Sequence, residues 1–131
     1  MLHYRRMRRG DVGAVVHLLV PNEEKELREI LRAQLRGTLH SHSQTLVVIC
    51  YETAPQTKMH VLGAAVLHRV LILSPERDSM AGMLSIHAAD GDEDFYVDAV
   101  FEGLFQEMQE RAKTSRWACR LEELGEGLTF V

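Results

Sequence analysis

The chain has 131 residues, of which 46% are hydrophobic and 26% charged, and its net charge is −4. A chain of this size and composition buries one core as a single globular domain, which excludes a disordered protein. The longest apolar runs are too short or too interrupted to cross a bilayer, so we predict no membrane-spanning segment. Met1 leads straight into alternating arginine and apolar residues without a signal peptide, and we therefore expect a cytoplasmic protein.

Charged residues gather in two clusters, a basic one near the N-terminus and an acidic one in the last third of the chain. The basic cluster comprises Arg5, Arg6, Arg8 and Arg9, and the acidic cluster comprises Asp90, Asp92, Glu93 and Asp94. Clusters of this kind are more often solvated faces than binding sites. Tyr4 is the one aromatic ring interleaved with the arginines, and the net charge is negative, so a nucleic-acid partner is not expected.

The first half of the chain predicts a strand, two helices and a second strand. We expect the first strand at residues 2–7 and, with Asp11 as N-cap, a helix over 11–20 that has one apolar face. A second helix follows over 22–36, because a proline and three glutamates favour its start and apolar residues recur at helical spacing. These apolar residues are Leu27, Ile30, Leu31 and Leu35. Residues 45–52 then hold five apolar residues in a row, the pattern of a strand covered on both faces.

The second half predicts three more strands and one long helix. Residues 59–72 complete a hairpin with the preceding strand, and their Gly63-Ala64-Ala65 stretch lets a backbone or a ligand approach closely. A fourth strand is expected over 83–88 and a fifth over 116–122. Between them, residues 95–113 show the most regular helical spacing in the chain. The apolar stripe of this helix consists of Val97, Val100, Phe101, Leu104, Phe105, Met108 and Ala112.

Neither the cysteines nor the histidines form a compact ligand pattern. Cys50 and Cys119 lie in separate apolar runs, so we expect two buried free thiols, which suits a reducing compartment. His40 and His42 lie two apart in a loop and would need distant partners to bind a metal ion.

The aspartates of the acidic cluster have the spacing that begins an EF-hand calcium loop. The match then fails, because Phe95 and Phe101 stand where that loop requires glycine and a bidentate glutamate. A solvated loop that caps the following helix is the expected role of this segment. We therefore predict no metal site.

The predicted elements follow the order strand, helix, helix, three strands, helix, strand, which resembles the GNAT superfamily of N-acetyltransferases. Three stretches are similar to the opening strand with its capped helix, the central hairpin and the fourth strand of that family. They are Tyr4-Arg5-Arg6-Met7 with Gly10-Asp11, Leu46–Ile49 with Val61-Leu62-Gly63-Ala64-Ala65-Val66, and Leu84-Ser85-Ile86-His87. The resemblance covers about residues 2–122. It implies one α/β (α+β) domain over residues 1–131, with a mixed, mostly antiparallel five-stranded sheet flanked by helices.

The resemblance also implies where an acyl donor would bind. In this family the fourth and fifth strands splay apart, and the pantetheine arm of acetyl-CoA lies between them against backbone groups of the fourth strand. The pyrophosphate binds amides at the start of the next helix, in a glycine-rich loop with a basic or amide side chain. The corresponding cofactor-binding residues here are Ser85, Ile86, His87, Phe95 and Tyr96. His87 is also the candidate catalytic base, since an imidazole titrates at about pH 6.5.

The sequence departs from the family pattern in two places. After His87 the loop has neither the glycine spacing nor the basic residue, and the acidic cluster stands there instead. Like charges about 5 Å apart repel by several kcal/mol before screening by salt, so we expect acetyl-CoA to bind weakly or not at all. Only a few residues follow Leu124, whereas the family continues with another helix and a hairpin. We expect either a fragment of a longer protein or a partner that supplies the missing part.

Two functional hypotheses follow. One is an acyl-CoA-dependent N-acetyltransferase with an atypical cofactor loop, and the other is a catalytically silent GNAT-like domain that binds a small molecule or a protein. A strand at 116–122 would leave an open edge with Trp117, Cys119 and Leu121 on one side. We expect a second copy, in a homodimer, or an additional C-terminal segment to cover that edge.

Overall fold

A computed structural model describes residues 2–20, 24–53, 59–89, 94–114 and 116–122. Its elements, in chain order, are β1 (His3–Arg6), a 3-10 helix (Arg9–Asp11), α1 (Val12–Leu19), α2 (Lys25–Gly37), β2 (Thr45–Thr53), β3 (Met59–Ile72), β4 (Ser79–Ala88), α3 (Asp94–Ala112) and β5 (Arg120–Glu122). The predicted order of strands and helices is therefore confirmed.

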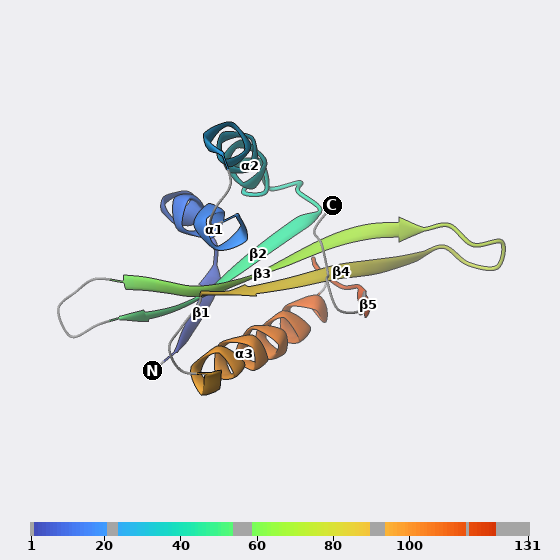
Figure 1. Cartoon of the computed structure of the whole chain (residues 1–131). Coiled ribbons are helices and arrows are strands. Elements are labelled where there is room, and N and C mark those ends of the chain that lie inside the picture. The colour runs from blue at the N-terminus through green and yellow to red at the C-terminus, as the bar shows by residue number, and fades with distance from the viewer. Residues whose placement is uncertain (1, 21–23, 54–58, 90–93, 115, 123–131) are drawn as a thin grey trace.

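The strands form one mixed sheet in the order β1-β2-β3-β4-β5. The first four strands pair antiparallel, and the short β5 pairs parallel with β4. Helices α1 and α2 lie on one face of the sheet and α3 on the other (Figure 1). This arrangement confirms the expected mixed, mostly antiparallel sheet flanked by helices, with the fifth strand reduced to three residues.

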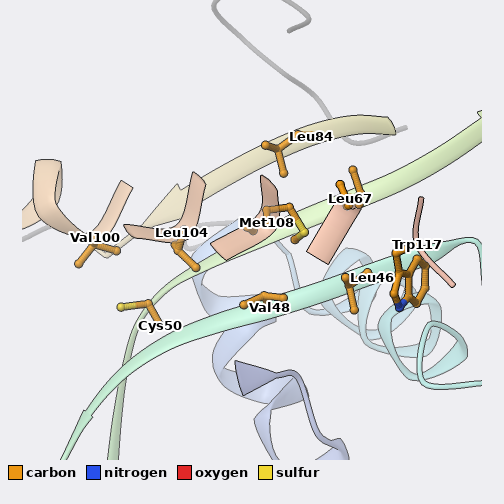
Figure 2. Packing of buried hydrophobic residues seen from close by; sticks show 11 residues of the cluster. Leu46, Val48, Cys50, Leu67, Leu84, Val100, Leu104, Met108 and Trp117 are labelled. Atoms are coloured by element: carbon orange, nitrogen blue, oxygen red, sulfur yellow. The ribbon is translucent and has the colours of Figure 1, made fainter. Parts of the chain in front are cut away.

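Two hydrophobic cores lie on the two faces of the sheet because successive strand residues point to opposite sides. On the α3 face, Leu46 and Val48 of β2 and Leu67 of β3 pack against Leu104 and Met108 (Figure 2). The core on the other face joins α1 and the neighbouring residues of the same strands, and it contains Val12, Val15, Val16, Leu35, Val47, Ile49, Ala64 and Val66. The expectation that β2 is covered on both faces is confirmed.

Gly63 explains how closely α3 approaches the sheet. A Cβ at this position would lie 2.7 Å from Val100 Cγ1, 3.0 Å from Leu104 Cδ1 and 2.9 Å from the carbonyl oxygen of His87. The close approach predicted at this small-residue stretch is therefore made by the protein's own helix.

The two strands that frame the candidate site differ from their predicted bounds. β4 begins at Ser79 rather than at residue 83. The reason is that β3 continues to Ile72, and the backbone of its last residues pairs with residues 79–82, whose own strand propensity is low. Residues 116–119 are not part of β5. The amide of Trp117 instead donates to the carbonyl of Thr114, and that of Cys119 donates to the carbonyl of Ala112. These bonds continue the turn at the end of α3 and shorten the strand.

The helices also differ in detail from the sequence prediction. α2 begins at Lys25 rather than at residue 22, since Glu24 has an extended backbone, and the expected start at residues 21–23 lies outside the described residues. Leu27 and Ile30 of the expected apolar face are 43% and 57% exposed, and Phe101 of α3 is 40% exposed. Helical spacing predicts which residues share a face, but it does not predict how much of that face is covered.

Trp117, predicted on an open strand edge, is buried in its own chain. Its side chain is 7% exposed and belongs to the core beneath α3, at the end of the row of side chains in Figure 2. The apolar edge inferred from Trp117 and Cys119 is therefore wrong for these two residues, and the side chain of Leu121 lies outside the described residues. Association with a second copy or a further segment stays a prediction, and light scattering at high concentration is its test.

Candidate functional site at the end of strand β4

The backbone of β4 has a β5 partner over only part of its length. Pairing joins Ala81–Met83 to Arg120–Glu122, with Arg120 at the paired end of β5. The expected divergence of the two strands at Arg120 is therefore wrong. Within the part of the chain that the structure describes, Leu84–Ala88 pair only with β3. The divergence expected at His87 depends on residues after Glu122, which lie outside the described residues.

Ser85 and His87 point to the α1 face of the sheet. They pair across the ladder with Val66 and Ala64, which belong to the core on the α1 side. Cross-strand partners share a face, so the two polar side chains face the layer of α1. Ile86 points the other way and packs against the α3 core. Of the predicted site residues on β4, Ser85 and His87 are thus brought together, and the side chain of Ile86 is used for packing.

Both polar side chains carry a buried atom without a hydrogen-bond partner. Ser85 is 3% exposed, and its Oγ and the Nε2 of His87 are unpartnered within the described structure. Buried polar atoms are nearly always hydrogen-bonded, so each of these two atoms needs a partner that the described residues do not supply. Burial also lowers the pKa of His87, because desolvation disfavours the imidazolium. The ring is therefore neutral at pH 7, with a nitrogen able to accept a proton.

The start of α1 is fixed against β1 by an ion pair between Arg5 and Asp11. The Nη1 and Nη2 atoms of Arg5 donate to the Asp11 carboxylate at 2.5 and 2.9 Å, and the backbone N–H of Arg8 donates to it at 2.8 Å. Burial alone would raise the pKa of Asp11, but these donors outweigh it and lower that pKa. The Asp11 side chain therefore accepts hydrogen bonds from Arg5 and Arg8, which precede it in the chain. It makes no capping hydrogen bond to α1, so the side-chain cap predicted from the sequence is wrong. The ion pair between Arg5 and Asp11 thus fixes the start of α1, the helix on the side of the sheet that Ser85 and His87 face.

The other predicted site residues lie at the start of α3 and in the segment before it. Phe95 and Tyr96 lie in the first turn of α3, and their side chains lie outside the described residues. Residues 90–93 of the acidic cluster also lie outside them. Cys50 and Cys119 are free, the first buried and the second half-buried. In the described ranges, no three His, Cys, Asp or Glu side chains gather as a metal site would require.

Sequence reasoning missed a cluster at the other end of α3, where Arg6, Arg69 and Arg116 surround Trp117. These residues come from β1, β3 and the turn after α3. No spacing pattern connects them, so only the fold brings them together.

The sequence matches no protein-family model, and a search of curated proteins finds no significant match. Solved structures match instead. A "predicted acetyltransferase" of Clostridium acetobutylicum, solved with acetyl-CoA, matches with a TM-score of 0.70 at 12% identity over 93% of this chain and 79% of that chain. An aminoglycoside 6′-N-acetyltransferase of Acinetobacter baumannii matches with a TM-score of 0.61 at 11% identity, covering 97% of this chain and 82% of that one. A GNAT family acetyltransferase of Staphylococcus aureus matches with a TM-score of 0.59 at 12% identity, covering 99% and 91%.

These structural similarities identify the fold as that of the GNAT acetyltransferases. The chain has this fold over its described elements, which confirms the resemblance drawn from the order of its strands and helices. At these identities the likeness concerns the fold, and function rests on the residues of the site. Among the helices described, none is both long and apolar enough to cross a membrane.

Proposed function

We propose that this domain is an acyl-CoA-dependent N-acetyltransferase with weak affinity for its acyl donor and with His87 as general base. The observation that carries the proposal is the unpartnered Nε2 of His87, on a neutral ring at the end of β4. A general base must be deprotonated at working pH and have a free acceptor atom that faces the substrate. His87 meets the first two conditions, and its position within Leu84–Ala88, the stretch of β4 that has no described partner on the β5 side, supports the third.

The described residues fit the thioester arm of an acyl-CoA better than its phosphates. Backbone groups of Leu84–Ala88 have no described partner on the β5 side, and an extended amide-bearing chain is suited to pair with such groups. The next segment carries the acidic cluster, which repels a pyrophosphate. Ser85, Ile86 and His87 would hold the arm, and the bound donor would supply an activated acyl group.

The chain's own residues would prepare the acceptor. The Nε2 of His87 accepts a proton from a protonated amine and leaves the free nitrogen lone pair that attack on an acyl group requires. The unpartnered Oγ of Ser85, about 7 Å along the strand, orients a polar group of the same substrate. The layer of α1 above this face limits the access of water, since Val12, Val15 and Val16 are buried there.

A second candidate is a catalytically silent domain that binds a small molecule or a protein. The acidic cluster favours it, because a loop that repels phosphates weakens the binding of any CoA thioester. In that case Ser85 and His87 would recognise a polar ligand without transferring a group to it. Binding of amines without turnover would favour this candidate over the transferase.

Calorimetry with acetyl-CoA tests the proposed donor. We expect a dissociation constant well above the micromolar range, and the pair of substitutions Asp92→Asn and Asp94→Asn should tighten binding roughly fivefold by removing two repulsive charges. Glu102→Gln removes one charge from an exposed position further along α3 and should leave the affinity unchanged. Raising the salt concentration should not weaken binding, as it would at a basic site. A low-micromolar constant for the unmodified chain would show that the acidic cluster does not oppose the donor.

A further inference from the structure

Three arginine side chains surround the ring of Trp117 at the C-terminal end of α3. The guanidinium carbons of Arg6, Arg69 and Arg116 lie 5.7, 5.0 and 5.4 Å from the ring centroid. Trp117 occupies the far end of the core from Val100 in Figure 2. The three charged groups therefore gather around one ring at the end of this core.

Hydrogen bonds to neighbouring groups hold these arginines in place. Arg69 donates from Nη1 to the carbonyl of Arg116 at 2.6 Å and from Nη2 to Oε1 of Gln44 at 2.9 Å. Arg116 donates from Nη2 to the carbonyl of Ser41 at 2.9 Å, and Arg6 donates to that of Thr38 at 3.5 Å. A guanidinium has five N–H donors, so donors remain on each group after these bonds. The donors are thus ordered before any ligand arrives.

The positive charge of the cluster is not neutralised within the described structure. No described carboxylate forms an ion pair with Arg6, Arg69 or Arg116, although the whole chain has a net charge of −4. Arg6 is also close enough to Arg111 and Arg116 to feel their charges: its pKa is lowered, first by burial and then by these two cations. Cations placed together in this way repel one another, and a bound anion would relieve that repulsion.

The surroundings restrict what the anion can be. Trp117 is 7% exposed beneath the arginines, so its ring is not available to stack on a nucleic-acid base. Guanidinium groups bind the oxygens of phosphate and carboxylate in pairs, and three of them within 5.7 Å of one ring centroid suit a compact group with several oxygens. We propose that Arg6, Arg69 and Arg116 form a binding site for a phosphate group, either free phosphate or the phosphate of a small molecule.

This site is separate from the one at the end of β4. Arg69 pairs with Gly82 across the ladder, five residues along β4 from His87, which is about 17 Å at the usual strand rise. Arg69 also contacts the core on the α3 face, whereas His87 points to the α1 face. The phosphate site therefore does not depend on the proposed acyl transfer, and His87→Gln should leave it unchanged.

Trp117 is the only tryptophan in the chain, so its fluorescence reports on the site directly. The experiment titrates the protein with inorganic phosphate and compares it with sodium chloride at equal ionic strength. We expect a saturable change with phosphate that chloride does not produce. A second titration with glycerol phosphate distinguishes the two sources: tighter binding than inorganic phosphate indicates the phosphate of a small molecule, and equal binding indicates free phosphate.

Variants separate ligand binding from a purely structural role of the arginines. Arg116 is exposed, and Arg116→Gln should weaken phosphate binding about tenfold through loss of one charge-assisted contact, while Arg116→Lys should retain part of it. The matched control is Arg77→Gln, an exposed arginine in the turn between β3 and β4, which should bind phosphate as the unmodified chain does. Circular dichroism confirms that each variant is folded. The proposal is overturned if phosphate gives no saturable change beyond chloride, or if folded Arg116→Gln binds phosphate with unchanged affinity.

Discussion

Replacing Gly63 with alanine places a methyl group between the sheet and α3 where the two approach most closely. The new Cβ would lie 2.7 Å from Val100 Cγ1 and 2.9 Å from the carbonyl oxygen of His87. The valine side chain can turn only within a filled core, because Val100 is 1% exposed. The carbonyl belongs to the adjacent strand and cannot move without disturbing the pairing of β3 with β4.

The expected cost follows from these contacts. Overpacking a filled core costs about 1–3 kcal/mol, and a rigid backbone atom among the contacts places Gly63→Ala near the upper half of that range. With an unfolding entropy of about 2.1 cal/mol/K per residue, each kcal/mol lowers the melting temperature of 131 residues by about 4 °C. The variant should therefore melt about 8–12 °C below the unmodified chain.

Thermal unfolding followed by far-ultraviolet circular dichroism measures the melting temperature, and urea unfolding measures the free energy of unfolding. Gly13→Ala is the matched control, because Gly13 lies exposed in α1 and a Cβ there meets nothing within 4 Å. Because Gly13 lies in the first turn of α1, the same chemical change there should leave the stability unchanged or raise it by less than about 1 kcal/mol. The reasoning is refuted if Gly63→Ala is as stable as the unmodified chain while Gly13→Ala behaves as expected.

Three further predictions concern packing, charge and thiol chemistry. Gly103→Ala would overlap the ring of Tyr4 and should cost about 1–3 kcal/mol in urea unfolding; in a Tyr4→Ala background that cost should vanish, and an unchanged cost would contradict the contact. Asp11→Asn should lose about 1.5–3 kcal/mol at pH 7. The pKa of Asp11 is lowered by folding, so the advantage of the unmodified chain should be present above about pH 4 and fade as the pH falls below it; an advantage that persists at pH 2 would refute this. Burial raises the pKa of Cys50 to about 11, so a thiol reagent at pH 8 should leave it unmodified until the protein unfolds, and rapid labelling of the native thiol would contradict its burial.

Most of the fold was predictable because it depends on local pattern. Five consecutive apolar residues predicted β2, and the spacing of Val100, Leu104 and Met108 predicted the buried face of α3. The small side chains after Leu62 predicted a close approach. In each case the pattern that makes the prediction lies within a few residues of the position that it concerns.

What the sequence did not predict depends on partners far along the chain. The early start of β4 follows from the length of β3, which pairs with it, and the turn at residues 116–119 follows from bonds to the end of α3. Trp117, Cys119 and Leu121 alternate with smaller or charged residues as in a strand, yet the fold buries Trp117 beneath arginines from β1 and β3. Neither periodicity nor propensity contains that information.

The candidate site was half predicted for the same reason. Position at the end of the fourth strand indicated Ser85 and His87, but only the register with Val66 and Ala64 shows that both face α1. That their Oγ and Nε2 atoms are buried without a partner is a property of packing and has no sequence signal. The role of Ile86 changed because alternation places it on the opposite face, in the α3 core.

The release of free CoA thiol from millimolar acetyl-CoA in the presence of primary amines tests the central claim most directly. The unmodified chain should release thiol faster than buffer, and only when an acceptor amine is present. His87→Gln should lower that rate by about 100-fold or more, the usual contribution of a general base, and should remain folded because the residue is only half-buried. Equal amine-dependent rates in the two proteins would contradict the role of His87. No amine-dependent release above buffer, with acetyl-CoA bound, would contradict the transferase itself and leave the silent binding domain.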